Sequence, residues 1–368
     1  MAQDEGSQKG AGGSHDRTDD PVMEMKSVPQ GIEWQAMHAE RNGAPGTARV
    51  IRALLPVLES ETAVGRRMAA WQGPVIRDAL PLRITAGLHH LLLTGQDRSL
   101  EPVYAGITTD QRTVDRLVGE MIHKHDTVLL PWLDGPPQTN EAGRSSAIMA
   151  GLAWLSQRLG PCFELNEIGA SAGINAMMDR YAYDLGGVEF GSSSPLRLAP
   201  EWRGDPPPDA GVTITGARGC DLKPIDLRDP EAVLRLKSYV WPEAVERMAR
   251  IDAAQSLAQE RAPELDRADA GDWVEAIMAE PQVEGTTRCL FHTIVWQYLP
   301  KITQDRIKRT VEQAGGAAGA ARPVAWLRLE TDRQTFAHEL QVRFWPGGEQ
   351  WVTLAAAHPH GAWVEWRA

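Results

Sequence analysis

The chain of 368 residues has few cysteines, few phenylalanines and tyrosines, and no long apolar run. Its three cysteines, Cys162, Cys220 and Cys289, are too few and too scattered for a disulfide framework or for a zinc site built from cysteine pairs. No apolar run approaches the ~18–20 residues that a membrane-spanning helix needs. No charged-then-apolar signal pattern opens the sequence. We therefore expect a cytoplasmic protein with no membrane partner.

Basic residues are fewer than acidic residues. Lys plus Arg number 38 and Asp plus Glu number 49, so the formal net charge is −11. Proteins that bind nucleic acid usually carry a basic face, so we expect no nucleic-acid partner. The apolar share of 42% is enough for a sizeable core, and the length fits one large or two ordinary domains. The sequence leaves the oligomeric state unknown.

The first two stretches of the chain differ in composition. Residues 1–29 are rich in Gly, Ser, Asp and Gln and predict a disordered tail, because such a segment buries too little apolar surface to offset its ordering entropy. Residues 30–160 place apolar residues at helical spacing, with prolines between the runs, and predict a helical N-terminal domain. The expected helices cover residues 50–58, 82–93, 113–125 and 145–159.

Residues 161–368 predict an α/β domain, because strand-like and helical runs alternate there and favour a mostly parallel sheet. The turn at residues 345–349 predicts that the last two strands form an antiparallel hairpin. Residues 186–210 are dense in Gly, Ser and Pro, and predict either an ordered insertion or a long loop. The expected strands cover residues 163–168, 212–214, 288–291, 324–329, 340–345 and 351–354. The expected helices cover residues 174–183, 230–259 and 302–314.

The most informative segment is residues 163–175, where an expected strand leads into small residues and then into a helix. Gly169, Ser171 and Gly173 let a ligand approach the backbone closely, and a helix directs its free N–H groups at such a ligand. Open α/β sheets bind ligands at the carboxyl ends of their strands. We therefore predict a Rossmann-like site for the cofactor S-adenosylmethionine (SAM), in which Glu167 closes the first strand.

Further residues fit a SAM site. Asp221, at the expected end of the next strand, would hold the ribose hydroxyls. Asp272, at the expected end of the following strand, would lie beside the adenine, on which Trp273 would pack. The segment that starts at Phe291-His292 is similar to the post-strand segment of many small-molecule methyltransferases, where a polar group faces the transferred methyl.

The same letters also match the G-x-S-x-G elbow of the α/β-hydrolases, with Ser171 as nucleophile. Asp272 and then His292, His358 or His360 follow in the required order. A hydrolase needs several strands before its elbow, however, and residues 31–160 indicate none. The elbow strand is usually apolar, whereas polar residues crowd this one. The context therefore favours the SAM-type site. A third interpretation is that the small residues only serve the packing of the turn.

Seven segments in order resemble a bacterial family catalogued as domain of unknown function 2332. The resemblance extends from about residue 34 to the end and implies a divergent class I methyltransferase-type fold with a helical N-terminal domain. One departure from typical methyltransferases is Ser171, since their loop carries Gly at that place. The segments are residues 138–144 (QTNEAGR), 167–175 (EIGASAGIN), 194–197 (SPLR), 201–204 (EWRG), 219–224 (GCDLKP), 240–242 (VWP) and 357–361 (AHPHG).

Together these patterns predict that the protein is a SAM-dependent methyltransferase that acts on a small molecule. The cofactor-binding candidates are Glu167, Gly169, Ser171, Gly173, Asn175, Asp221 and Asp272. The acceptor-side candidates are His292, Glu141 and Asn140, and His292 is the first choice for general base because a histidine titrates near neutral pH. We expect no metal, because His123 and His125 would point to different faces of a helix, and His358 and His360 lack a matching acid nearby in sequence. The alternatives are a serine hydrolase and a non-catalytic protein that binds SAM or a nucleotide.

Overall fold

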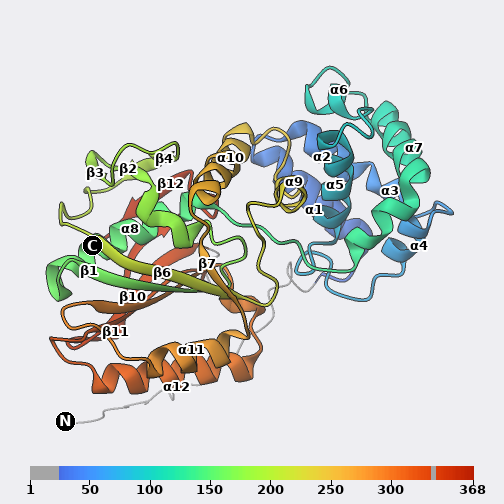
Figure 1. Cartoon of the computed structure of the whole chain (residues 1–368). Coiled ribbons are helices and arrows are strands. Elements are labelled where there is room, and N and C mark those ends of the chain that lie inside the picture. The colour runs from blue at the N-terminus through green and yellow to red at the C-terminus, as the bar shows by residue number, and fades with distance from the viewer. Residues whose placement is uncertain (1–24, 333–336) are drawn as a thin grey trace, which may run out of the picture.

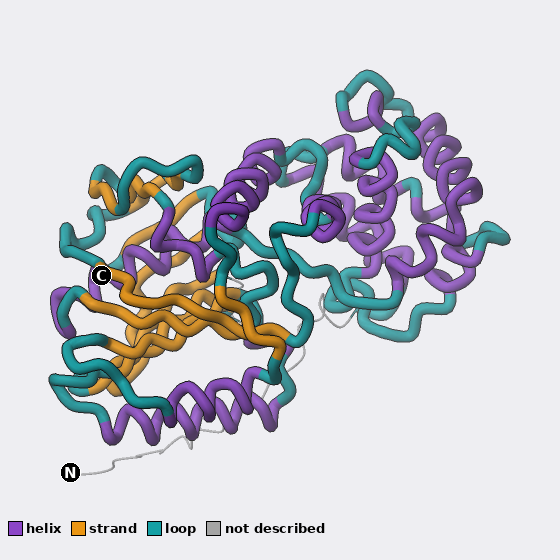
Figure 2. The backbone as a smooth tube through the Cα atoms, in the orientation of Figure 1, coloured by secondary structure: helices purple, strands orange, loops and turns teal. Residues whose placement is uncertain are grey.

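The computed structural model describes residues 25–332 and 337–368, which form a helical lobe and a lobe built on a large sheet (Figures 1 and 2). The predicted disordered tail lies mostly outside the described residues. Its end does not, since helix α1 (Val28–Arg41) already begins inside residues 1–29. Among residues 25–332 and 337–368, no helix is long and apolar enough to cross a membrane.

The helical lobe has its own apolar core, to which α1, α5 and α7 contribute residues such as Ile32, Ile84 and Val118. Prolines in the first turn begin α1, α2 and α5, where a missing N–H costs nothing. Asp110 caps α7 by accepting a hydrogen bond from the Thr113 N–H at 2.9 Å. The helices after α1 are α2 (Pro45–Arg52), α3 (Leu54–Val57), α4 (Ala63–Ala69), α5 (Leu80–Leu93), α6 (Glu101–Tyr104), α7 (Gln111–Leu129) and the 3-10 helix η1 (Leu130–Leu133).

The second lobe contains a nine-stranded sheet in the order β5-β12-β11-β10-β9-β8-β1-β6-β7 and a small three-stranded sheet in the order β3-β2-β4. All seven residues of the central strand β8 are buried. The strands are β1 (Cys162–Ile168), β2 (Ala182–Leu185), β3 (Val188–Phe190), β4 (Arg197–Leu198), β5 (Glu201–Arg203), β6 (Thr213–Asp221), β7 (Glu264–Arg267), β8 (Thr287–Thr293), β9 (Val324–Thr331), β10 (His338–Trp345), β11 (Gly348–Ala357) and β12 (Trp363–Trp366).

The large sheet is mostly parallel, as the sequence predicts for an α/β fold with a helical N-terminal region. Strands β7, β6, β1, β8 and β9 are all parallel neighbours. Successive strands run from β1 outward to β6 and β7, and the chain then returns to β8 on the other side of β1. The predicted antiparallel hairpin is β10–β11. The sheet continues beyond it, since β12 pairs antiparallel with β11 and parallel with β5.

Helices cover both faces of this sheet (Figure 1). Helices α8 (Ser145–Leu159) and α10 (Val245–Glu260) pack on one face in the largest apolar cluster. Helices α11 (Ala270–Ala279) and α12 (Lys301–Ala317) pack on the other face around Trp326. The predicted boundary at residue 160 does not coincide with this division of the cores. Helix α8 belongs to the sheet core, whereas α9 (Pro230–Ser238) joins the two cores: its Val233 and Leu236 lie in the sheet core, and the helix also packs on α5 of the helical lobe.

Three expected helices differ from the observed ones. Residues 174–183 form only the 3-10 helix η3 (Asn175–Arg180) before strand β2 begins, so the prediction of an α-helix there is wrong. The expected helix over 230–259 is interrupted between α9 and α10, because Pro242 disfavours helical geometry at Trp241. The expected helix over 50–58 is split, because Pro56 has no N–H to donate to Arg52. Residues 186–210 contribute the short strands β3, β4 and β5.

Candidate functional site

The candidate site lies at the carboxyl end of β1, between β6 and β8, where the strand order reverses. The loop of small residues leaves β1 with positive φ at Gly169, Ser171 and Gly173 (68°, 53° and 70°). The end of β6 holds this loop, because the Ala170 N–H donates to the Cys220 carbonyl at 3.0 Å. The sequence therefore forms a tight left-handed turn at the place where open α/β sheets bind ligands.

The two glycines of the loop are required by their surroundings in the protein. A Cβ atom at Gly169 would lie 2.3 Å from Cγ2 of Val295, and one at Gly173 would lie 2.8 Å from Cγ of Pro263. Both spaces are filled by side chains, so the glycines serve the turn and its packing. Ser171 differs, because its buried hydroxyl has no hydrogen-bond partner among the described residues.

Glu167 is a buried carboxyl group with little support. Its Oε1 accepts one long hydrogen bond of 3.4 Å from Nδ2 of Asn175, and its Oε2 has no partner among the described residues. Burial raises the pKa of Glu167 to about 8, although Asn175 and the nearby Arg144 charge act in the other direction. A buried polar atom without a partner costs free energy, so this oxygen marks a place that a cationic or donor group of a ligand would stabilise.

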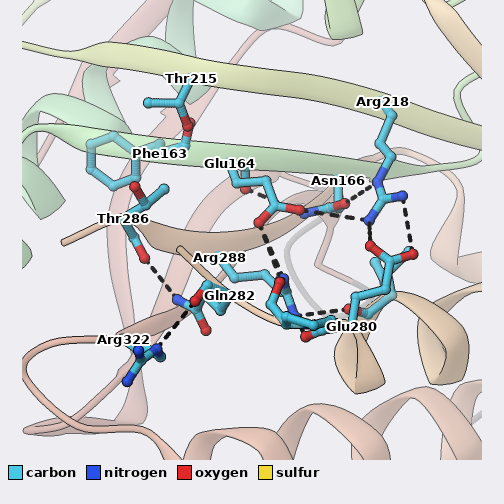
Figure 3. Close-up of polar contacts among 12 residues, drawn as sticks. Phe163, Glu164, Asn166, Thr215, Arg218, Glu280, Gln282, Thr286, Arg288 and Arg322 are labelled. Carbon is cyan, nitrogen blue, oxygen red and sulfur yellow. Dashed lines mark hydrogen bonds and ion pairs between the residues drawn. The ribbon is translucent and has the colours of Figure 1, made fainter. Parts of the chain in front are cut away.

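The other polar residues of β1 are already satisfied within the protein (Figure 3). Glu164 accepts two hydrogen bonds of 3.3 Å from Arg288. Asn166 accepts from Nε of Arg218 at 3.1 Å. Side chains alternate along a strand, so these two residues point to the face covered by α11, and Glu167 points to the face covered by α8. Of the polar residues that crowd this strand, only Glu167 belongs to the candidate site.

The segment before α8 reaches the loop as well. The Asn140 side-chain oxygen accepts from the Ile174 N–H at 2.9 Å, directly after Gly173. The Ser145 hydroxyl donates to Oδ1 of Asn175 at 2.9 Å. Asn140 and Asn175 thus join the candidate loop to the start of α8. Because both side chains are buried in these bonds, they position the loop.

Glu141 points away from the loop toward α10. Its carboxylate accepts from Nε of Arg247 at 2.9 Å and pairs with the same guanidinium through Nη2. Arg144 shares the helix start with Glu141 but does not pair with it. Its Nε donates to the Pro359 carbonyl at 2.8 Å and its Nη1 to the Thr293 carbonyl at 3.2 Å. Glu141 and Arg144 are three residues apart, yet the structure gives their side chains separate partners.

His292 occupies the other face of the sheet. Its neighbour Phe291 lies opposite Glu167 in the β1–β8 register, so His292 faces the α12 side, where its ring stacks on Trp296 with centroids 5.1 Å apart. Its Nδ1 lies 2.6 Å from Oε1 of Glu330. If the ring is neutral, the Nδ1 proton donates to this carboxylate and Nε2 is an acceptor. That Nε2 is buried and has no partner among the described residues.

Glu330 is a residue that the sequence analysis did not single out. It lies near the end of β9 and also accepts from the Val295 and Trp296 N–H groups at 3.1 and 3.2 Å. Its sequence signal was available, since an acid at the end of a buried strand is the same feature that identified Glu167. Arg247 carried no such signal, because its position beside Glu141 depends on the packing of α10.

The two other acidic candidates have different positions. Asp221 ends β6 as expected, is half-buried, and accepts from the Ser171 N–H at 3.0 Å and the Lys223 N–H at 2.8 Å. It therefore holds the loop and the segment after β6. The strand-end position expected for Asp272 is wrong. This residue lies in the first turn of α11, where its carboxylate is 70% exposed and pairs with Arg306. Asp266 takes the strand-end place on β7 and accepts from Nε1 of Trp273 at 2.7 Å.

Three histidines lie near Arg144. His358 and His360 follow β11 in a turn with ring centroids 5.3 Å apart, and His338 begins β10. Burial and the neighbouring arginine charges lower the pKa of His360 well below its ordinary value, and burial lowers that of His338 to about 4. In the described part of the chain, no group of three His, Cys, Asp or Glu side chains is arranged to hold a metal ion. A cavity of about 380 Å³ lies elsewhere, beside η3 and the start of β6.

Comparison with known proteins identifies the family of this chain. The model of a family described as an uncharacterized protein conserved in bacteria (DUF2332) matches residues 30–366, so the chain belongs to that family. No curated protein and no solved structure matches.

Proposed function

We propose that this protein binds SAM at the carboxyl end of β1 and transfers its methyl group to a small molecule. The observation that carries the proposal is the buried carboxyl of Glu167, whose Oε2 has no partner among the described residues, beside a left-handed loop of small residues at the reversal of strand order. Ligands of open α/β sheets bind at such reversals. A ligand with a positive charge suits Glu167, and SAM carries both an ammonium and a sulfonium group.

The arrangement of the sheet supports a Rossmann-like interpretation of the methyltransferase type. The parallel strands β7, β6, β1, β8 and β9 have the order 3-2-1-4-5, which is the order of the first five strands in Rossmann folds. The antiparallel strands β10, β11 and β12 stand where a sixth parallel strand would otherwise follow. The fold alone does not imply an activity, so the proposal depends on the residues of the site.

The residues present fit the cofactor in part. Glu167 offers an unpartnered oxygen to a cationic group, and Ser171 offers a buried hydroxyl. Asp221, half-buried at the end of β6, would hold the ribose, although two backbone N–H groups already use its oxygens. SAM, when bound, supplies an electrophilic methyl group. Asn140, Asn175 and Asp221 keep the loop in place, and this positioning is the main contribution that methyl transfer needs from a protein.

His292 is the candidate that would remove a proton from an acceptor. Glu330 fixes the ring through Nδ1, so in the neutral imidazole Nε2 would be the nitrogen that accepts a proton, as in a general base. Its ring is fully buried against Trp296, so an acceptor reaches Nε2 only if this stack separates. Glu141 is a weaker candidate, because Arg247 already occupies its carboxylate.

The first experiment is calorimetric titration with S-adenosylhomocysteine, the product form of the cofactor. The wild type, Glu167→Gln and Asp272→Asn should be compared. Both variants replace a carboxylate by an amide, but only Glu167 lies at the loop, and Asp272 is exposed on α11. We expect binding that is lost or strongly weakened in Glu167→Gln and unchanged in Asp272→Asn. The proposal fails if the folded wild type does not bind, or if both variants bind like the wild type.

Binding without methyl transfer to any tested small molecule would favour the non-catalytic SAM- or nucleotide-binding alternative. The buried position of the His292 ring is the feature that favours it. A panel of acceptors with hydroxyl, amine, thiol and carboxyl groups, followed by release of S-adenosylhomocysteine, separates the two cases.

A second candidate function is serine hydrolysis by Ser171. It is favoured by the φ of 53° at this residue, since the nucleophile elbow places its serine on a strained turn. Against it, the Ser171 hydroxyl has no histidine partner among the described residues, and no strand precedes β1 in residues 25–161 to supply an oxyanion hole. Labelling of the wild type but not of Ser171→Ala by a fluorophosphonate would establish this alternative.

A further inference from the structure

Arg144 is a buried cation without a carboxylate partner. Its side chain makes hydrogen bonds only to the Pro359 and Thr293 carbonyls and a long contact of 3.4 Å to the Thr293 hydroxyl. Its Nη2 has no partner among the described residues. Burial lowers the pKa of Arg144, and the nearby charges of Glu141 and Glu330 act in the other direction. A buried guanidinium in this state is stabilised by any anion that reaches it.

Arg288 shows how this protein completes a buried arginine elsewhere (Figure 3). Its guanidinium donates to the Glu164 carboxylate and to the carbonyls of Ile277, Glu280 and Pro281. Arg144 has the carbonyl part of this arrangement and lacks the carboxylate. Arg83, the third buried arginine of the described residues, also lacks a carboxylate and donates to the carbonyls of Asp78 and Leu133, but its Cζ lies 5.1 Å from the centroid of the Trp71 ring. Among the described residues, Arg144 has neither a carboxylate nor an aromatic ring as a partner, so an anion would complete its surroundings.

The acidic groups around Arg144 are engaged elsewhere or uncharged. Glu141 is paired with Arg247, and Glu330 accepts from His292 and two backbone N–H groups. Glu167, with a pKa of about 8, is mostly protonated at pH 7. The other groups close to Arg144 are Arg247, His338, His360 and the exposed Tyr298, and none of them is an anion at neutral pH. The end of β8 and the turn at residues 358–361 thus hold Arg144 near two carboxylates, Glu141 and Glu330, whose charges favour its charged form but which bond to other groups.

We propose that Arg144 binds a carboxylate group of a ligand at the end of β8, with its Nη2 donating to that carboxylate. Two ligands could supply it: the amino-acid end of the cofactor, or an acidic acceptor molecule. Both would place an anion next to the candidate site, since Arg144 directly precedes α8, whose first residue, Ser145, donates to Asn175 after the loop. The first source rests on the proposed function, whereas the second requires only the anion site.

The test compares the wild type with Arg144→Gln, Arg144→Lys and the control Arg250→Gln. Arg250 donates to the His360 carbonyl at 3.2 Å and so supports the same turn from a less buried position. Calorimetry measures the binding of S-adenosylhomocysteine and of 5′-methylthioadenosine, which carries the same nucleoside without the amino-acid end. Thermal unfolding measures stabilisation by benzoate against chloride at equal ionic strength.

If the carboxylate belongs to the cofactor, Arg144→Gln should weaken the binding of S-adenosylhomocysteine by roughly tenfold or more. The affinity for 5′-methylthioadenosine should stay unchanged. If it belongs to the acceptor, both nucleosides should bind Arg144→Gln normally, and benzoate should stabilise the wild type but not this variant. In either case Arg250→Gln should behave like the wild type. Arg144→Lys keeps the charge without the planar fork, and should lose part of the effect; it also serves if the glutamine variant does not fold.

The proposal is wrong if the Arg144 variants bind both nucleosides with equally changed affinity, or with unchanged affinity, and if benzoate stabilises these variants as much as it stabilises the wild type. Arg144 would then be a clamp for the turn at residues 358–361. If the wild type binds neither nucleoside, the proposed function fails, and the benzoate comparison alone decides whether Arg144 holds an anion.

Discussion

Replacing Glu167 by glutamine should change how the stability of this protein depends on pH. In the folded chain this carboxyl is buried, with one oxygen unpartnered, and its pKa rises from an ordinary value of 4.5 to about 8. The folded state therefore keeps a proton that the unfolded chain releases above pH 4.5. The contribution of Glu167 to stability is fully present below pH 4.5 and is lost as the pH rises toward 8. Glutamine has nothing to titrate and removes this loss.

The size of the effect follows from the two pKa values. Each pH unit between them corresponds to about 1.4 kcal/mol, so a rise from 4.5 to about 8 amounts to about 5 kcal/mol as an upper value. Between pH 5 and pH 8, the free energy of unfolding of the wild type should fall by up to about 4 kcal/mol relative to Glu167→Gln. A steady offset between the two proteins, caused by the altered hydrogen bond to Asn175, does not affect this difference.

Urea unfolding at pH 5, 6, 7 and 8 measures the difference directly. Asp272→Asn is the matched control, because it removes an exposed carboxylate from the same lobe. Parallel pH profiles for the wild type and Glu167→Gln would refute the reasoning, since they would mean that Glu167 titrates alike in the folded and unfolded chains. A wild type that gains stability relative to the variant toward pH 8 would show an ionised carboxylate, supported by Arg144 within the protein.

Three further predictions follow from the site. If a cationic ligand ionises Glu167, binding of S-adenosylhomocysteine at pH 7 should release about 0.9 proton from the wild type and none from Glu167→Gln. Calorimetric titration in buffers of different ionisation enthalpy measures this release. Ser171→Gly should raise the free energy of unfolding by up to about 1 kcal/mol, because φ is 53° there, whereas Ser171→Ala should not; equal urea midpoints for both variants would exclude strain. Gly169→Ala should destabilise by about 2 kcal/mol or more, through positive φ and contact with Val295, and Val295→Ala should restore part of the loss in a double-mutant cycle.

The sequence predicts the elements whose pattern is strong and local. Helix α8 matches the expected bounds, and β1, β8 and β9 are found where buried apolar runs indicate them. Strand β7 was missed, because it has four mostly exposed residues and its place depends on pairing with β6. The packing of α9 on the helical lobe has no local signal either. Such features arise from long-range contacts, which composition and spacing do not encode.

The candidate site shows the same division between local and long-range information. The loop, Glu167 and Asp221 follow from motif and strand-end position, and the structure brings them together. Asp272 was misplaced, because the missed β7 already ends at Arg267, and Asp272 follows five residues later in the first turn of α11. Arg144 was visible in the sequence only as a neighbour of Glu141. Its separate role depends on the carbonyls of Thr293 and Pro359, which are distant in the chain.

Strand register limits what the site can do. Glu167 and Arg144 lie on the α8 face, whereas His292 and Glu330 lie on the α12 face, and the sheet separates them until its strands end. A reaction that uses both groups must therefore take place beyond the ends of β1 and β8, where Thr293 and Ile294 turn away from the sheet. Ile294 has a φ of 52° there, and the Arg144 guanidinium binds the preceding carbonyl. Because this turn joins the carboxylate-binding candidate to the histidine, its geometry decides whether Nε2 of His292 takes part in chemistry or only completes the core.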